Sequence, residues 1–113
     1  GHVLAATADL AAAGLPEKLM IDFSHANSRK DYRRQMEVCS DTCAQLASGN
    51  QAIFGVMVES HLVEGRQDPK PGQPLTFGQS ITDACIGWEN TEQLLASLAQ
   101  AVARRRTLAK TNA

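Results

Sequence analysis

The chain has 113 residues, a net charge of −1 and 43% hydrophobic residues, which is typical of one globular domain at most. The balanced charge and the 4% of aromatic residues favour neither a nucleic-acid surface nor a stacking platform for single strands. For these reasons we expect no nucleic acid as partner. No apolar run approaches 18 residues, so we expect no membrane as partner either. The odd number of cysteines, three, favours free thiols and a cytoplasmic location.

The first part of the chain predicts a helix and then a strand. Residues 2–13 are rich in alanine, which favours helix. Gly14 and Pro16 follow, in the order expected beyond a helix C-terminus. The apolar run KLMIDF at residues 18–23 is short and typical of a buried strand.

A second helix is expected after this strand. Ser28 offers an N-cap, with Asp31 three residues further on in the arrangement of a capping box. Gly49 is placed to end the helix. Between them an apolar stripe has helical spacing and consists of Tyr32, Met36, Cys39, Cys43 and Leu46. This stripe explains two of the cysteines as packing residues.

The middle of the chain predicts two strands separated by a long loop. Residues 51–60 are apolar at nearly every position, as in parallel strands that are buried on both faces. Residues 64–78 hold three of the four prolines, so we expect a long irregular loop, a kind of segment that is often functional. Residues 79–87 are expected to form a third short strand.

The last element is predicted to be a helix that begins near Asn90, which can cap it with Gln93 at the third position. Its three consecutive arginines, 104–106, are expected in the last turn, as a solvated helix end. Residues 107–113 are expected to be a frayed tail. Strands that alternate with helices in this order indicate an α/β fold with parallel βα units.

Three ionisable residues follow apolar runs at equivalent places. His25 follows MIDFS, Glu59 follows GVMV and Asp83 follows QSIT. Their separations, 59 − 25 = 34 and 83 − 59 = 24 residues, bracket the roughly 30 residues of one unit in a (β/α)₈ barrel, whose strand C-termini meet on one rim. Imidazole and carboxylates together suit Mn, Fe, Co or Zn. The spacing therefore predicts a divalent-metal site.

Other interpretations of these residues stay open. Polar side chains also occur at strand ends because the chain is leaving the core, so spacing alone is compatible with a structural role for each one. The chain could then be a non-catalytic α/β interaction module without a metal site, whose long loop binds a protein partner. An unrelated metal hydrolase is a third interpretation, but no clear general base stands out. His61, two residues beyond Glu59, is more typical of a loop contact or of a group behind the ligands.

The motifs MIDFSHANS, GVMVESHLVEG and SITDACIGWE closely resemble the C-terminal part of the type I 3-deoxy-D-arabino-heptulosonate 7-phosphate (DAHP) synthases. The resemblance extends from about Gly14 to the last helix. It implies a (β/α)₈ barrel enzyme, an aldol-type transferase that condenses phosphoenolpyruvate with erythrose 4-phosphate and releases phosphate. This reaction is the first step of the shikimate pathway to the aromatic amino acids.

The same resemblance implies a divalent metal bound by Cys, His, Glu and Asp. Carried over by motif, His25, Glu59 and Asp83 are three of these ligands. The family's cysteine ligand lies on an early strand and is absent here, because Cys85 belongs to the TDAC motif itself. The metal would polarise the aldehyde of erythrose 4-phosphate. His25 and Asp83 would also be catalytic, next to phosphoenolpyruvate and a sugar hydroxyl respectively.

The chain would therefore supply about three of the eight βα units of a barrel. Three parallel strands cannot close a barrel, and they leave open edges and uncovered apolar faces. We expect residues 1–113 to be an incomplete C-terminal piece of the catalytic domain. Alone it should be inactive, and it should associate with copies of itself.

Overall fold

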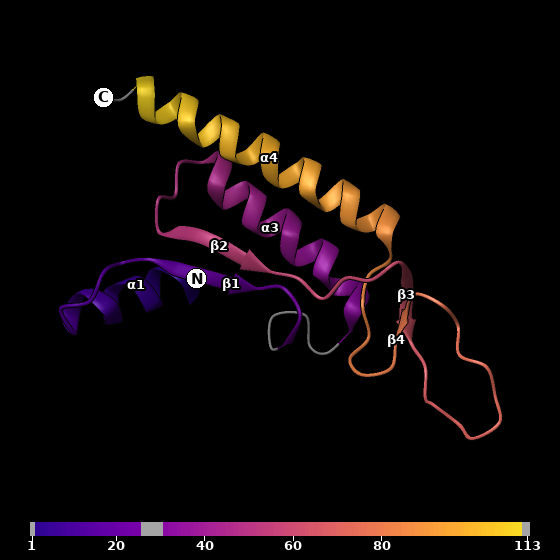
Figure 1. The fold of residues 1–113 in the computed structure, drawn as a ribbon. Helices are drawn as coiled ribbons and strands as arrows, with labels where there is room; N and C mark the ends of the chain where they lie inside the picture. Colours follow the sequence, from indigo (N-terminus) through magenta and orange to yellow (C-terminus); the bar gives the residue numbers. More distant parts are fainter. Residues whose placement is uncertain (1, 26–30, 112–113) are drawn as a thin grey trace.

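The structure is a computed structural model that describes residues 2–25 and 31–111 (Figure 1). The elements are α1 (His2–Ala12), β1 (Leu19–Asp22), the 3₁₀ helix η1 (Tyr32–Arg34), α3 (Gln35–Ala47), β2 (Ile53–Met57), β3 (Val63–Arg66), β4 (Gln79–Ser80) and α4 (Trp88–Thr111). The molecule is elongated, with extents of 61 × 31 × 18 Å. Within the described ranges, no helix has the length and apolar character needed to cross a membrane.

The central sheet consists of β1 and β2, which pair in parallel with Asp22 opposite Met57. Helix α3 lies between this sheet and α4, and α1 lies beside β1 (Figure 1). The parallel pairing confirms the predicted βα arrangement. The expected burial of both faces of β2 is wrong, because Phe54 is 66% exposed and Met20 on β1 is 58% exposed. In the described part of the chain, α3 and α4 cover only the opposite face.

The predicted helix and strand at the start of the chain are confirmed. Helix α1 ends where Gly14 adopts φ +72°, a left-handed conformation that costs glycine little. The N–H groups of Gly14 and Leu15 donate to the carbonyls of Ala11 and Leu10. Those two bonds satisfy carbonyls that the end of a helix would leave without partners.

The helix after β1 begins differently from the expectation. Ser28, the predicted cap, lies outside the described residues. The Asp31 carboxylate accepts a hydrogen bond from the Arg33 N–H at 3.1 Å, so Asp31 itself caps η1, and α3 continues from it. The predicted end is confirmed, since Gly49 has φ +104° just past α3. The predicted stripe is buried at Cys39 and Leu46.

The middle of the chain corrects two expectations. The loop expected at 64–78 is wrong at its start, because Val63–Arg66 forms β3, which pairs in parallel with β4. The strand expected at 79–87 is reduced to Gln79–Ser80 and two isolated bridges. In one of these bridges Gly65, at φ +86°, exchanges two hydrogen bonds with Cys85. This antiparallel exchange takes the N–H and C=O groups that a continuous parallel ladder would need.

Helix α4 begins two residues before the predicted cap at Asn90. The Trp88 N–H donates to the Leu62 carbonyl, and the Thr91 N–H and hydroxyl both donate to the Gly87 carbonyl. The bonds to Gly87 belong to the first turn of the helix itself, whereas the bond to Leu62 is a tertiary contact that supports a start at Trp88.

The end of α4 is also longer than expected. The arginines do not occupy its last turn, because the helix continues to Thr111. Arg105 is not solvated as predicted: its guanidinium donates to the carbonyls of Asn50 at 3.1 Å and Ile53 at 2.8 Å. The frayed tail expected at 107–113 is wrong for 107–111, which are helical, and 112–113 lie outside the described residues.

The core consists of two clusters of buried residues, one of Phe23, Cys39, Ile86 and Leu94 and a second of Leu46, Ile53 and Ala101. Phe23 directly follows the C-terminal end of β1, whereas Ile53 is the first residue of β2. In the first cluster, Phe23 is two residues before His25, and Ile86 is three residues after Asp83. Packing of this cluster therefore restrains the main chain just before His25 and just after Asp83.

Burial raises the pKa of the Cys39 thiol to about 12, and the nearby Cys43 thiol, 3.8 Å away, raises it further in the same direction. Between about pH 9 and pH 12 the unfolded state loses this proton while the folded state keeps it, so the free energy of unfolding falls as pH rises. In thermal melts, we expect Cys39→Ala to lower the melting temperature at pH 7 but to flatten its decline above about pH 9. Parallel declines in the two proteins would contradict this origin.

Candidate metal centre

The structure brings together the three residues that the spacing predicted. His25 Nε2 lies 3.1 Å from Glu59 Oε1 and 3.6 Å from Asp83 Oδ2. One ligand atom of each residue lies within 4.8 Å of those of the other two. His25 and Glu59 follow the C-terminal ends of β1 and β2, and Asp83 lies in the bend after β4. Because β1 and β2 are parallel, His25 and Glu59 lie at the same end of the sheet. The Ser60–Ile86 bridge holds the segment that carries Asp83 next to them.

These distances fit the ligands of one divalent ion. Two atoms bound at about 2.1 Å with an angle between 90° and 109° lie roughly 3.0–3.4 Å apart, close to the observed 3.1 and 3.6 Å. One nitrogen and two carboxylate oxygens suit first-row transition metals better than calcium. The two carboxylates also supply the negative charge that a divalent cation needs. The donor set and its spacing therefore fit a metal centre.

Asp22 orients the imidazole of His25. Its carboxylate lies 2.8 Å from His25 Nδ1 and accepts the N–H groups of Ser24 at 2.8 Å and His25 at 3.2 Å. With Nδ1 engaged, Nε2 is the nitrogen that faces Glu59 and Asp83. A carboxylate behind a histidine ligand fixes the tautomer and increases the basicity of the ligand. Asp22, the last residue of β1, therefore contacts the ring nitrogen of His25 that does not face the other two ligands.

The acidic groups around His25 shift the pKa values of the pair. The hydrogen bond with Asp22 and its negative charge raise the pKa of His25, and the charge of Glu59 adds to the effect. Burial raises the pKa of Asp22, but the hydrogen bonds from His25 and Ser24 outweigh it and leave that pKa below its usual value. The site thus attracts positive charge, which is the electrostatic condition for binding a cation.

Each of the other two ligands is held by a neighbour. The Gln35 side chain exchanges two hydrogen bonds of 2.9 Å with the main chain of Glu59. Arg66 donates from Nε to the carbonyl of Thr82, the residue before Asp83, at 2.7 Å. A cavity of about 410 Å³ opens over this cluster, and its lining includes His25, Glu59, Asp83, Tyr32 and Arg66.

The sequence indicated the ligands but missed Asp22 and Gln35 as their supports. For Asp22, the spacing of three residues from His25 was an available signal. Gln35 lies four residues before Cys39 on the predicted stripe, so an uncharged polar side chain on an apolar helix face was the signal for it.

Two other side chains of types that can bind metals, near these motifs, lie outside the cluster. His61 is exposed, and its Nδ1 accepts the neighbouring Leu62 N–H at 2.8 Å, which makes it a loop contact. Cys85 is buried, and its thiol donates to the Asp83 carbonyl at 3.4 Å. Burial raises its pKa, as do the charges of Glu59 and Asp83, so the thiolate that a metal binds is disfavoured at this position.

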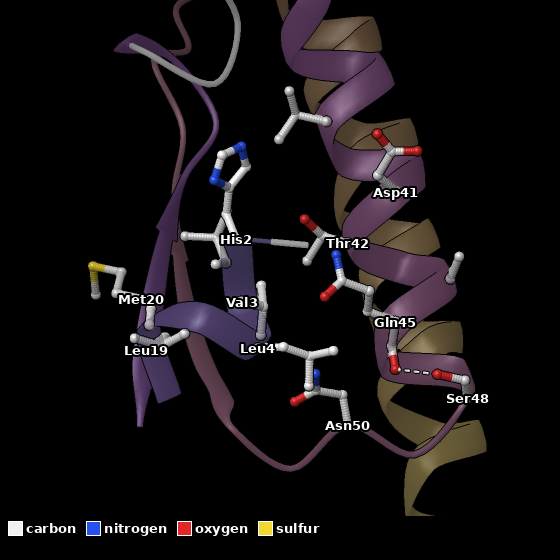
Figure 2. Close-up of a pocket in the computed structure, with 14 residues that line it drawn as sticks. His2, Val3, Leu4, Leu19, Met20, Asp41, Thr42, Gln45, Ser48 and Asn50 are labelled. Carbon is white, nitrogen blue, oxygen red and sulfur yellow. Dashed lines mark hydrogen bonds between the residues drawn. The ribbon is translucent and has the colours of Figure 1, made fainter. Parts of the chain in front are cut away.

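A larger hollow, of about 840 Å³, lies elsewhere, between α1, β1 and α3 (Figure 2). Its lining includes Leu4 and Met20 on one side and Asp41 and Gln45 on the other (Figure 2). His2 and Asp41 are its ionisable groups, and neither belongs to the metal-ligand cluster. Size therefore does not identify the site in this chain, whereas the convergence of ligands does.

Comparisons with known proteins place this chain in one family. The model of the DAHP synthetase I family matches residues 2–96. The Phe-sensitive phospho-2-dehydro-3-deoxyheptonate aldolase of Escherichia coli K12 is 60% identical over 105 residues, 93% of this chain and 30% of the relative. The aldolase of Haemophilus influenzae is 61% identical over 99 residues, 88% of this chain and 27% of the relative.

A solved structure agrees with these matches. The phospho-2-dehydro-3-deoxyheptonate aldolase from Francisella tularensis superposes with a TM-score of 0.86 at 47% identity, over 92% of this chain and 30% of that one. The chain spans 27–30% of the length of these relatives. The resemblance found in the three motifs is confirmed: the chain belongs to the DAHP synthetase I family.

Proposed function

We propose that this chain is part of a DAHP synthase, an enzyme that condenses phosphoenolpyruvate with erythrose 4-phosphate to form DAHP and phosphate. The proposal rests on family membership together with one observation, the convergence of His25, Glu59 and Asp83 at the strand ends. The metal bound there would act as a Lewis acid on the aldehyde oxygen of the sugar phosphate. Which of the four candidate metals is native does not affect this assignment.

The side chains of the cluster have distinct roles in the proposal. Asp22 engages His25 Nδ1, so that Nε2, which faces Glu59 and Asp83, is the nitrogen that would bind the ion. Glu59, whose side chain is 16% exposed, is the most buried of the three ligands and would bind the ion from the protein side. Asp83, 72% exposed, can also accept a hydrogen bond from a sugar hydroxyl. His25, 56% exposed, faces the cavity where phosphoenolpyruvate would bind.

One titration distinguishes a metal centre from a non-catalytic interaction module without a metal site. Mn²⁺ is titrated into the chain, and the loss of the electron paramagnetic resonance signal of the free ion is measured. A metal centre with three ligands should bind one ion, weakly because the family's cysteine ligand is missing. Absence of binding would overturn the metal centre and favour a non-catalytic interaction module. Product formed from the two substrates by this chain alone would overturn its expected inactivity.

We further propose that the chain supplies about three βα units from the C-terminal part of a (β/α)₈ barrel. The parallel β1–β2 pair, the strand-end spacing and the missing cysteine ligand support this placement. Three free cysteines support a reducing compartment, which we propose to be the cytoplasm. A native subunit about three times longer is expected, and a native mass near 12.1 kDa would overturn the placement.

The isolated chain is expected to associate with copies of itself. Leu4, Met20 and Phe54 are each more than half exposed, and each of the two sheets in residues 2–25 and 31–111 has two strands and open edges. Such surfaces bury apolar area when two copies meet. Light scattering coupled to size-exclusion chromatography should therefore give a mass above that of one chain. A compact monomer at micromolar concentration would contradict this expectation.

A further inference from the structure

We infer that Gln35 is a positioning residue for the metal centre, acting through the main chain of Glu59. The inference rests on the proposed function, because it assigns a role in the same site to a residue that bears no ligand atom. Gln35 is the first residue of α3, and its side chain touches neither His25 nor Asp83 through any hydrogen bond that the structure describes.

The burial of Gln35 requires an explanation. It is 0% exposed, the only polar residue among the largest fully buried side chains of the described ranges. Burying a side-chain amide costs free energy unless both its donor and its acceptor find partners. A leucine or methionine would fill this position in the core without that requirement. The amide is therefore retained for what it binds.

Both ends of the amide bind a single residue. The Nε2–H donates to the Glu59 carbonyl at 2.9 Å, and Oε1 accepts the Glu59 N–H at 2.9 Å. This is the two-bond exchange of a hydrogen-bonded pair of strand residues, supplied here by a side chain. It occurs two residues past Met57, where the ladder of β2 has already ended. Gln35 therefore extends the pairing of β2 to the ligand.

The same main chain connects two ligands. The Glu59 carbonyl also accepts the Ile86 N–H at 3.0 Å, and Ile86 follows Asp83 by three residues and is 0% exposed. Gln35 and Ile86 thus hold Glu59 from two sides. Rotation about the Glu59 backbone would break both bonds from Gln35, so the Cα–Cβ direction from which the carboxylate extends is fixed before an ion arrives. Such preorganisation is what supports outside the ligand shell supply to metal sites.

The test replaces Gln35 with methionine, which has a similar volume and no amide, and measures Mn²⁺ affinity by the free-ion resonance signal. Loss of a support of this kind typically weakens metal binding about 10- to 100-fold, and we expect a loss in this range. Thr42→Val is the matched control. Thr42 is 2% exposed and lies two turns along the same face of α3, so its change should lower the melting temperature and leave the affinity unchanged.

The pathway through Glu59 has its own readout. In a Glu59→Ala background, adding Gln35→Met should cause no further loss of affinity, although the melting temperature should still fall. A further loss there would show that Gln35 does not act through Glu59. Unchanged affinity in Gln35→Met alone would overturn the inference while leaving the metal centre intact. No binding by the wild-type chain would instead overturn the metal centre, and the inference with it.

If Gln35→Met does not fold, the wild-type chain still decides the question. The hydrogen exchange of the Gln35 side-chain amide, followed by nuclear magnetic resonance, should slow when saturating Zn²⁺ is added, because the ion restrains Glu59 and thereby both of its bonds to Gln35. Exchange that stays the same with and without bound Zn²⁺ would overturn the inference.

Discussion

Replacing His25 with alanine is expected to abolish the binding of Mn²⁺ at concentrations that saturate the wild-type chain. The imidazole is the one nitrogen donor of the cluster, and its Nε2 lies within 3.6 Å of both carboxylates. Loss of a direct ligand should exceed the 10- to 100-fold effect of losing a support behind it, so we expect a decrease on the order of 100-fold or more. Calorimetric titration of the two proteins would measure it.

His61→Ala is the control for this substitution. The substitution removes another exposed imidazole, two residues from Glu59. The Nδ1 atom of His61 accepts the Leu62 N–H. The affinity of this variant for Mn²⁺ should match that of the wild-type chain. If His25→Ala binds as tightly as His61→Ala, then the convergence of His25, Glu59 and Asp83 is a structural cluster of strand-end residues and not a metal centre.

Phe23→Ala should be the most destabilising single change in the described core. Phe23 is 0% exposed and packs with Ile86 and Leu94. Removing a buried phenylalanine side chain leaves a cavity and costs about 3–5 kcal/mol, a large share of the 5–15 kcal/mol that stabilises a typical domain. Urea denaturation followed by circular dichroism would measure the change in the free energy of unfolding.

Phe54→Ala provides the comparison within the same sheet. Phe54 lies on β2 and is 66% exposed, so its removal forfeits little packing and should change the free energy of unfolding by about 0.5 kcal/mol or less. It should also weaken self-association if the exposed face of the sheet mediates it. Equal destabilisation by the two substitutions would mean that a second copy already buries Phe54 in solution.

Much of the local structure could be predicted because its causes lie within a few residues. Alanine content and Gly14 determine α1 and its end, and Gly49 determines the end of α3. The apolar runs before His25 and Glu59 form two parallel strands. The two residues therefore follow the C-terminal strand ends on the same side of the sheet. Ligand identity could therefore be inferred from spacing along the chain.

Other features depend on partners that are distant in sequence. The start of α4 moved to Trp88 because Leu62 supplies a carbonyl, and Arg105 is held by two carbonyls more than 50 residues away. The predicted third strand is shortened to Gln79–Ser80, and beyond it Cys85 pairs with Gly65 in an isolated bridge. No local propensity encodes such hydrogen bonds, since each depends on where another segment packs.

The sequence by itself determined the helices and the two strands of the central sheet, which family the motifs indicate and which three side chains could bind a metal. The tertiary structure decided how those side chains are held: Asp22 behind His25, Gln35 beside Glu59 and Arg66 on the segment before Asp83. The physical reason is that a ligand's type is a property of one residue, whereas its direction is set by hydrogen bonds from elsewhere in the fold.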